Sequence, residues 1–126
     1  MIGYVTLGTN DIARASAFYD ALLSELGAKR VFDMDRIKFY GATPGAPMLA
    51  VCIPYDQGPA HPGNGTMVSI PVKGGLAQIT RLYNKALALG ATDEGAPGER
   101  IPGVFTGAYV RDLDGNKLCF FEMKMG

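Results

Sequence analysis

The feature that most constrains the fold is an internal repeat. Leu26-Gly27-Ala28 recurs as Leu89-Gly90-Ala91, 63 residues further along the chain of 126 residues. Each copy ends a stretch whose apolar residues lie three and four positions apart, which is typical of an amphipathic helix, and each helix follows a β-rich run. A unit of about 60 residues buries too little surface to be stable alone, so the two units are expected to pack together.

Each unit is predicted to have the order strand, helix and three strands. The elements expected in the first unit are Ile2–Gly8, a helix from Ile12 to Leu26, Ala28–Asp33, Arg36–Tyr40 and Met48–Pro54. Those expected in the second are Thr66–Val72, a helix from Leu76 that ends at Gly90, Thr92–Glu94, Thr106–Arg111 and Lys117–Met123. The Gly- and Pro-rich stretch after Glu94 is expected to be a loop.

The boundaries follow from the same pattern. Module 1 is predicted at about 1–54, a Gly- and Pro-rich linker at 55–64, and module 2 at about 65–126. Near the end of each unit the repeat aligns Tyr40 with Tyr109 and Leu49-Ala50 with Leu118-Cys119.

Composition excludes several classes of partner. Lys plus Arg and Asp plus Glu both number 12, so the chain lacks the basic excess that nucleic acids and anionic membranes require. No apolar run is long enough to span a bilayer, and no signal peptide is visible. Cys52 and Cys119 both lie in apolar strand-like runs, which favours free thiols and a cytoplasmic location.

The order of the motifs resembles the vicinal oxygen chelate superfamily, which includes glyoxalase I, extradiol dioxygenases, fosfomycin-resistance enzymes and bleomycin-resistance proteins. Its first strand and helix are similar to Tyr4–Leu7, Asn10–Ala15 and Phe18-Tyr19, and its Asp-Pro-Asp-Gly turn to Asp112–Asn116, with Leu113 at the usual proline. The resemblance covers nearly the whole chain. It implies one α+β domain in which two tandem βαβββ modules form a curled, cup-shaped mixed sheet with helices outside.

The resemblance also implies four metal-ligand positions. Metalloenzymes of the superfamily usually place histidine on the two opening strands and glutamate on the strands that close each unit. Here the matching residues are Tyr4, Ala50, Met67 and Cys119, none of which is His, Asp or Glu. A hard or borderline divalent ion prefers imidazole and carboxylate donors. We therefore expect no metal and no other cofactor.

A ligand pocket is nevertheless expected in the cup. Strand alternation and the family pattern place residues of one parity there: Tyr4, Thr6, Met48, Ala50, Cys52, Met67, Ser69, Cys119 and Phe121. Tyr109 is added because a tyrosine at the matching place contacts the bound anion in fosfomycin-resistance members. Such a mildly polar, aromatic lining suits a small organic molecule. The alternative is that these side chains simply fill the barrel.

Three arginines and one cysteine are further candidates. Arg36, Arg100 and Arg111 could each pair with an acidic ligand, or each could be a solvated surface residue. Cys119 could act as a nucleophile only if a base such as His61, the one histidine, lowered its pKa.

The first functional hypothesis is a glyoxalase/bleomycin-resistance-like protein that binds a small organic molecule without metal. The alternatives are a metal-dependent glyoxalase-like lyase, isomerase or dioxygenase with non-standard ligands, and a silent scaffold. Whether the protein is an enzyme stays open. The family resemblance favours a homodimer, in which the modules pair within a chain or exchange between chains.

Overall fold

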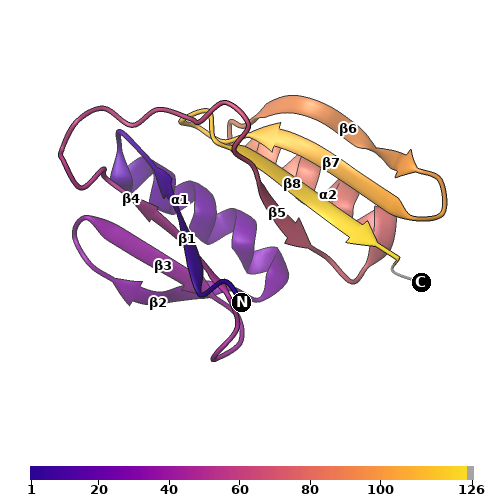
Figure 1. Cartoon of the computed structure of the whole chain (residues 1–126), viewed down its shortest axis with the longest axis horizontal. Coiled ribbons are helices and arrows are strands. Elements are labelled where there is room, and N and C mark those ends of the chain that lie inside the picture. Colours follow the sequence, from indigo (N-terminus) through magenta and orange to yellow (C-terminus); the bar gives the residue numbers. More distant parts are fainter. Residues whose placement is uncertain (125–126) are drawn as a thin grey trace. The chain divides into compact units, whose positions relative to one another are not determined.

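The computed structural model of the chain describes residues 1–124. The chain divides after Pro62 into two compact units, each with one α-helix and a four-stranded mixed sheet (Figure 1). This confirms the predicted α+β class and the two tandem βαβββ modules. The last two residues of the predicted second module, 125 and 126, lie outside the described part.

Module 1 follows the predicted element order closely. Its elements are β1 (Tyr4–Gly8), α1 (Ile12–Leu23), the 3-10 turn η1 (Ser24–Leu26), β2 (Lys29–Asp33), β3 (Ile37–Gly41) and β4 (Met48–Cys52). The strand order is β1-β4-β3-β2, with β1 parallel to β4. The Asp11 side chain caps α1 by accepting a hydrogen bond from the Arg14 amide. Gly27, in the left-handed region at φ 72°, ends the helical segment.

Module 2 repeats this arrangement. Its elements are β5 (Val68–Pro71), α2 (Gly75–Ala88), β6 (Thr92–Ile101), β7 (Phe105–Arg111) and β8 (Lys117–Met123), in the sheet order β5-β8-β7-β6. The predicted hairpin turn joins β7 to β8. The Asp112 carboxylate accepts hydrogen bonds from the amides of Asp114 and Asn116, and Gly115 supplies the positive φ of 89°.

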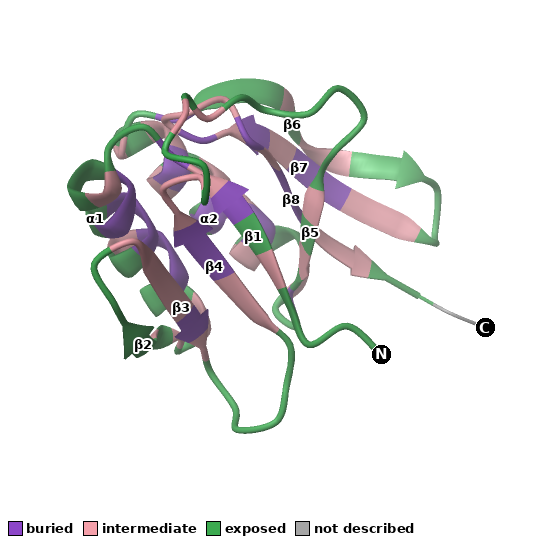
Figure 2. Ribbon diagram, turned by 60° about the vertical axis from the view of Figure 1, so that its left-hand side comes forward, coloured by how far each residue is buried: buried purple, intermediate pink, exposed green. Residues whose placement is uncertain are grey.

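Each helix packs against one face of the sheet of its own module (Figure 1). The core lies at this contact: in module 2, Ile79 and Leu82 of α2 are fully buried, as are Val110, Leu118 and Phe120 of the sheet (Figure 2). We call the opposite side of each sheet its helix-free face. Because side chains alternate along a strand, Cys119 and Phe121 point to the helix-free face while Leu118 and Phe120 point to the helix.

One predicted loop is a strand. The Gly- and Pro-rich stretch after Glu94 continues β6 to Ile101, and it pairs with β7 through several register shifts. Strand β6 is at the edge of the sheet and pairs with β7 on one side only. Pro97 has no amide N–H to donate, and an edge strand tolerates this because no second strand lies beside it. Gly95 and Gly98 lie opposite Tyr109 and Gly107, so the glycines that suggested a loop permit close packing instead.

The predicted alignment of Tyr40 with Tyr109 is wrong by one residue. Tyr40 pairs with Leu49 in module 1, whereas Tyr109 pairs with Cys119 in module 2, so Phe39, opposite Ala50, is the structural counterpart of Tyr109. A shift of one residue moves a side chain to the other face of a sheet. Tyr40 is accordingly buried on the helix side, and Tyr109 lies on the helix-free face.

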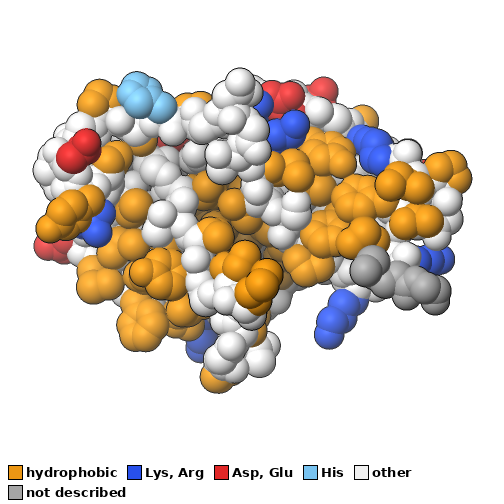
Figure 3. Space-filling view, viewed as in Figure 1, with side chains coloured by type: hydrophobic (Ala, Val, Ile, Leu, Met, Phe, Trp, Pro, Cys, Tyr) orange, Lys and Arg blue, Asp and Glu red, His pale blue; other side chains and the backbone are white. Residues whose placement is uncertain are grey.

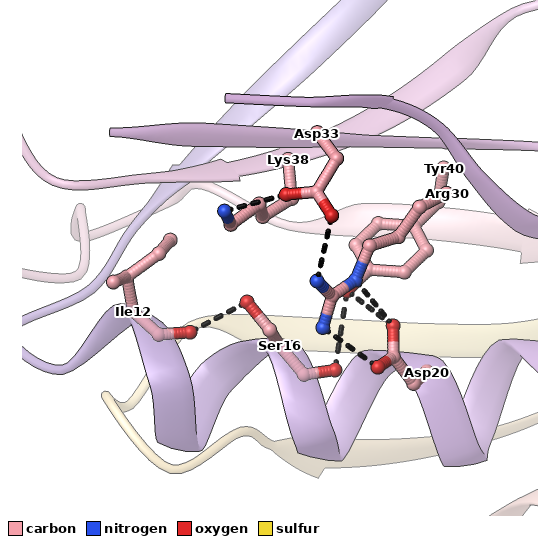
Figure 4. Close-up of polar contacts among 7 residues, drawn as sticks. All are labelled: Ile12, Ser16, Asp20, Arg30, Asp33, Lys38 and Tyr40. Atoms are coloured by element: carbon pink, nitrogen blue, oxygen red, sulfur yellow. Dashed lines mark hydrogen bonds and ion pairs between the residues drawn. The ribbon is translucent and has the colours of Figure 1, made fainter. Parts of the chain in front are cut away.

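A charged cluster joins α1 to the sheet of module 1 (Figure 4). The Arg30 guanidinium donates to both carboxylate oxygens of Asp20, at 2.9 and 2.7 Å, and to Asp33 at 3.1 Å. Lys38 completes the cluster 2.6 Å from Asp33. The Tyr40 hydroxyl lies 2.8 Å from Asp20, and burial together with this carboxylate raises the pKa of Tyr40 to about 12. The cluster therefore fixes the helix on the sheet by polar contacts.

Candidate functional site on the helix-free face of module 2

Three of the predicted pocket residues form a row across module 2. Ser69 of β5 pairs with Cys119 of β8, which pairs with Tyr109 of β7. The next position in the row is Gly95 of β6. A Cβ at Gly95 would lie 2.8 Å from Cδ2 of Tyr109, so the absence of a side chain there makes room for the phenol ring. Hydroxyl, thiol and phenol groups thus lie side by side on one face.

The row is uncharged at neutral pH. Cys119 is 0% exposed, and burial raises the pKa of its thiol, although contacts with Tyr109 and Ser69 oppose that shift. Burial likewise raises the pKa of Tyr109. Cys119 is therefore a neutral thiol at pH 7 and is not activated as a nucleophile. His61 is exposed and belongs to the other compact unit.

An aromatic surface continues the row along the strands. Phe121, also a predicted pocket residue, stacks on Phe105 with ring centroids 5.4 Å apart and planes inclined by only 5°. Gly107 pairs directly with Phe121, and a Cβ at Gly107 would approach the Phe105 ring to 2.9 Å. Hydrophobic side chains gather over β7 and β8 in the space-filling view (Figure 3). Flat apolar groups have a complementary surface here.

The structure distinguishes the three candidate arginines. Arg111 forms an ion pair of 2.7 Å with Glu94, and Arg36 donates to the Ile53 carbonyl and covers the Tyr55 ring. Arg100 instead lies over the Tyr109 ring, with its central carbon 5.3 Å from the ring centroid. Arg100 is therefore the arginine that lies beside the row.

The helix-free face of module 1 holds five predicted residues: Tyr4, Thr6, Met48, Ala50 and Cys52. Thr6 pairs with Ala50, and Ala50 with Phe39, in the row that corresponds to Ser69, Cys119 and Tyr109. The Tyr4 ring lies edge-on to Phe39 at 4.9 Å, and Phe39 contacts Phe32 in the same way. This face is aromatic. Met67 precedes β5 and is 41% exposed.

Sequence reasoning missed several residues of these faces. Phe39 was obscured by the one-residue error at Tyr40, and Phe105 lies just before the predicted start of its strand. Lys117 also lies beside the row, with its ammonium nitrogen 5.5 Å from the Tyr109 centroid. Two-residue alternation from Cys119 would have found Lys117, because positions 117, 119 and 121 share a face.

Relatives are clear from both sequence and structure. The sequence profile of the Glyoxalase/Bleomycin resistance protein/Dioxygenase superfamily matches residues 1–120. The chain belongs to this superfamily. A glyoxalase/bleomycin resistance protein from Albidiferax ferrireducens T118 is 32% identical, with a TM-score of 0.88 over 98% of this chain and 99% of that one. No curated protein sequence gives a significant match.

Two further structures of the superfamily share the fold. One is a family enzyme from Burkholderia phytofirmans PsJN, 20% identical with a TM-score of 0.76, covering 97% of this chain and 98% of that one. The other is a glyoxalase-related enzyme from Fulvimarina pelagi, 22% identical with a TM-score of 0.74, covering 97% and 87%. At these identities the likeness concerns the fold alone.

The residues at the superfamily's metal positions do not fit a divalent ion. Ala50 has no donor atom, Met67 lies outside β5, and the Tyr4 ring packs on Phe39. Cys119 could supply one thiolate, but a single thiolate donor does not make a site for a divalent ion. Within residues 1–124, no group of three His, Cys, Asp or Glu side chains lies close enough together to hold a metal ion.

A small hollow in module 2 lies elsewhere and has none of the predicted residues. Its lining is Glu99, Gly103, Val104, Thr106, Glu122 and Lys124. The volume of about 50 Å³ is far below the 300 to 1,000 Å³, roughly, of organic-ligand pockets. Water molecules fit there, but an organic ligand does not.

The predicted linker is partly built into module 1. The Asn10 side chain accepts a hydrogen bond from the Ala60 amide at 2.7 Å and donates to the Ala60 carbonyl at 3.3 Å. The compact unit extends to Pro62 for this reason. Across residues 1–124, no helix combines the length and apolar character needed to cross a membrane.

Proposed function

We propose that the protein binds a small organic molecule on the helix-free face of module 2. The observation that carries the proposal is the row of Ser69, Cys119 and Tyr109, which presents neutral hydrogen-bonding groups beside the Phe105–Phe121 stack. A few polar groups within an apolar surface are typical of small-molecule sites. Membership of the superfamily supports the proposal, because the matching strands carry its ligand sites.

Binding is proposed to proceed without the superfamily's metal. The support is the donor chemistry at Tyr4, Ala50, Met67 and Cys119, which offers no imidazole or carboxylate. Ser69 and Tyr109 instead provide hydroxyl groups that orient a ligand by hydrogen bonds. The three residues carry no activated nucleophile, so the row supports binding and not covalent catalysis.

A homodimer is proposed as the working assembly. The support is the small size of each module, since units of about 60 residues bury a limited core. Light scattering at micromolar concentration should give twice the monomer mass of 13.4 kDa. A stable monomer would overturn the assembly and leave the binding proposal intact.

The binding proposal is tested by an NMR screen of small organic molecules against isotope-labelled protein. Ligands should shift the amide signals of Ser69, Tyr109 and Cys119. Tyr109→Phe and Ser69→Ala should each weaken binding about 3- to 10-fold, the value of one hydrogen bond. Tyr55→Phe is the matched control, because Tyr55 is 85% exposed in module 1 and should leave binding unchanged. Shifts confined to other surfaces would refute the proposal.

Metal content separates the proposal from its main alternative. Elemental mass spectrometry of untagged protein, before any chelator, should find no stoichiometric divalent metal. Near-stoichiometric nickel, zinc, iron or manganese that is lost in Cys119→Ala would show that the row holds a metal. The protein would then be assayed as a metal-dependent lyase, isomerase or dioxygenase.

A further inference from the structure

Two cations flank the aromatic ring at the centre of the proposed site. The Arg100 guanidinium and the Lys117 ammonium lie 5.3 and 5.5 Å from the centroid of the Tyr109 ring. They come from different strands, β6 and β8, on the two sides of β7. The ring therefore lies between two positive charges on one face of the sheet.

Neither cation has an acidic partner in residues 1–124. Arg100 donates only to the backbone carbonyls of Gly98 and Ala96, and Lys117 forms no ion pair. The nearby carboxylate of Glu94 is occupied by Arg111 at 2.7 Å. By contrast, in module 1 Arg30 and Lys38 are both neutralised by aspartates. The positive charge beside Tyr109 is left for a ligand.

The backbone is shaped to hold Arg100 in this place. A Cβ at Gly95 would lie 3.3 Å from one terminal guanidinium nitrogen, and a Cβ at Gly98 would lie 3.3 Å from the other. The side chain thus runs back along β6 over two glycines and is fixed there by the two carbonyls. A guanidinium has five N–H donors, so donors remain for an anionic group.

The aromatic stack lies close to these cations. Phe121 is two residues from Cys119 on β8, which is about 7 Å along a strand. Phe105 stacks on it over Gly107. A ligand whose anionic group lies beside Tyr109 can therefore place a flat apolar group on this stack. One or two fused aromatic rings span that distance.

We propose that module 2 selects small organic anions that carry a flat apolar group, with Arg100 and Lys117 contacting the anionic group beside Tyr109. This rests on the proposed function and names the class of its ligand. The anion supplies the countercharge that the protein lacks at this place, and the Phe105–Phe121 stack accepts the ring.

The test compares matched pairs of probes that differ in charge. Benzoate and 2-naphthoate are titrated beside benzamide and 2-naphthamide, and affinity is followed through the Tyr109 and Cys119 amide signals. The acids should bind about 10-fold or more tightly than the amides, as expected for charge-assisted hydrogen bonds. Added salt should weaken the acids only.

Variants assign the preference to the two cations. In the double variant Arg100→Gln/Lys117→Gln, the acid and the amide of each pair should bind equally. Arg81→Gln is the matched control, because it removes an exposed positive charge on α2 of the same module and should keep the preference. Arg100→Lys retains the charge and should keep most of the preference for acids. This variant controls for the possibility that glutamine at position 100 distorts β6.

The outcomes separate this inference from the function on which it rests. Equal affinity of acids and amides on the helix-free face would overturn the anion assignment and leave small-molecule binding in place. An acid preference that survives in the double variant would also overturn it. If no compound of the wider screen, charged or neutral, shifts this face, the proposed function falls as well.

Discussion

Module 1 and module 2 share a βαβββ framework but keep their polar side chains on opposite sides of their sheets. In module 1 the ion pairs of Asp20, Arg30, Asp33 and Lys38 lie toward the helix, and the helix-free face is aromatic. In module 2 the core between helix and sheet is apolar, with a hydrogen bond from Tyr83 of α2 to Asp93 of β6 at its surface. There the hydroxyl, thiol, phenol and cationic groups occupy the helix-free face.

The difference teaches where to look for function in a duplicated fold. Charges that pair with each other beside a helix stabilise a module and leave nothing for a ligand. Charges without an acidic partner stay available to a ligand of opposite charge. In module 1 the charged side chains stabilise the fold, whereas in module 2 Arg100 and Lys117 are available to bind a ligand.

The largest expected effect tests the apolar contact in module 2. Phe120→Ala should lower the free energy of unfolding by about 3 to 5 kcal/mol, because the fully buried ring leaves a cavity. Phe121→Ala, one position along on the other face, should cost less than half as much. Urea unfolding followed by circular dichroism measures both. Equal losses would mean that both faces of β8 are equally important to the core.

A smaller loss of stability is expected at Gly95, which makes room for the Tyr109 ring. Gly95→Ala should lower the free energy of unfolding by about 1 to 3 kcal/mol, since the new Cβ would lie 2.8 Å from the Tyr109 ring. It should also displace the Tyr109 side chain and weaken ligand binding. Gly3→Ala is the control, because nothing lies within 4 Å of its Cβ. Thermal unfolding that does not distinguish the two variants would contradict the packing described.

The hydrogen bond of Tyr40 in module 1 should contribute more to the free energy of unfolding than that of Tyr83 in module 2. Tyr40→Phe should lower the free energy of unfolding by about 1 to 2 kcal/mol, because it removes a buried hydroxyl that bonds the Ser16 carbonyl and the Asp20 carboxylate. Tyr83→Phe removes a similar hydrogen bond to Asp93 on the surface and should lower the free energy of unfolding clearly less than Tyr40→Phe does. The same urea titrations give both values. A larger loss in Tyr83→Phe would reverse the comparison.

The smallest effect depends on pH. Lys38 and Arg30 hold the pKa of Asp33 below its ordinary value of 3.8. The charged carboxylate therefore stabilises the folded state at neutral pH, and this contribution disappears as the pH falls below that value. Asp33→Asn should lower the melting temperature slightly at pH 7, and the difference should shrink as the pH falls below 3.8 and vanish once Asp33 is protonated in the folded protein. A difference that does not shrink on acidification would assign the effect to packing.

Much of the fold was predictable because its signals are local. Strand β8 was predicted with its observed bounds, Lys117–Met123. The Asp112–Asn116 turn determines where the strand begins, and the apolar residues after the turn identify it as a strand. Strand β6 was missed because its glycines and proline are typical of loops, and only pairing with β7 makes them a strand. Edge strands tolerate such sequences when the neighbouring strand supplies the order.

The candidate site was only half predictable. Alternation placed Ser69, Cys119 and Phe121 on one face, because that rule depends on the strand alone. The choice of Arg100 over Arg111 depends on which carboxylate lies across the sheet, and register shifts in β6 hide this from the sequence. Tyr40 was aligned with Tyr109 because residue type matched, while the backbone register differed by one.

The unequal burial of the two cysteines has a practical consequence. Cys119 is fully buried within its row, whereas Cys52 at the end of β4 is partly accessible. A thiol-reactive dye at neutral pH should therefore attach to a single sulfur, in module 1, without any engineering of the chain. Such a label would be a reporter on module 1, while the proposed site in module 2 stays unmodified.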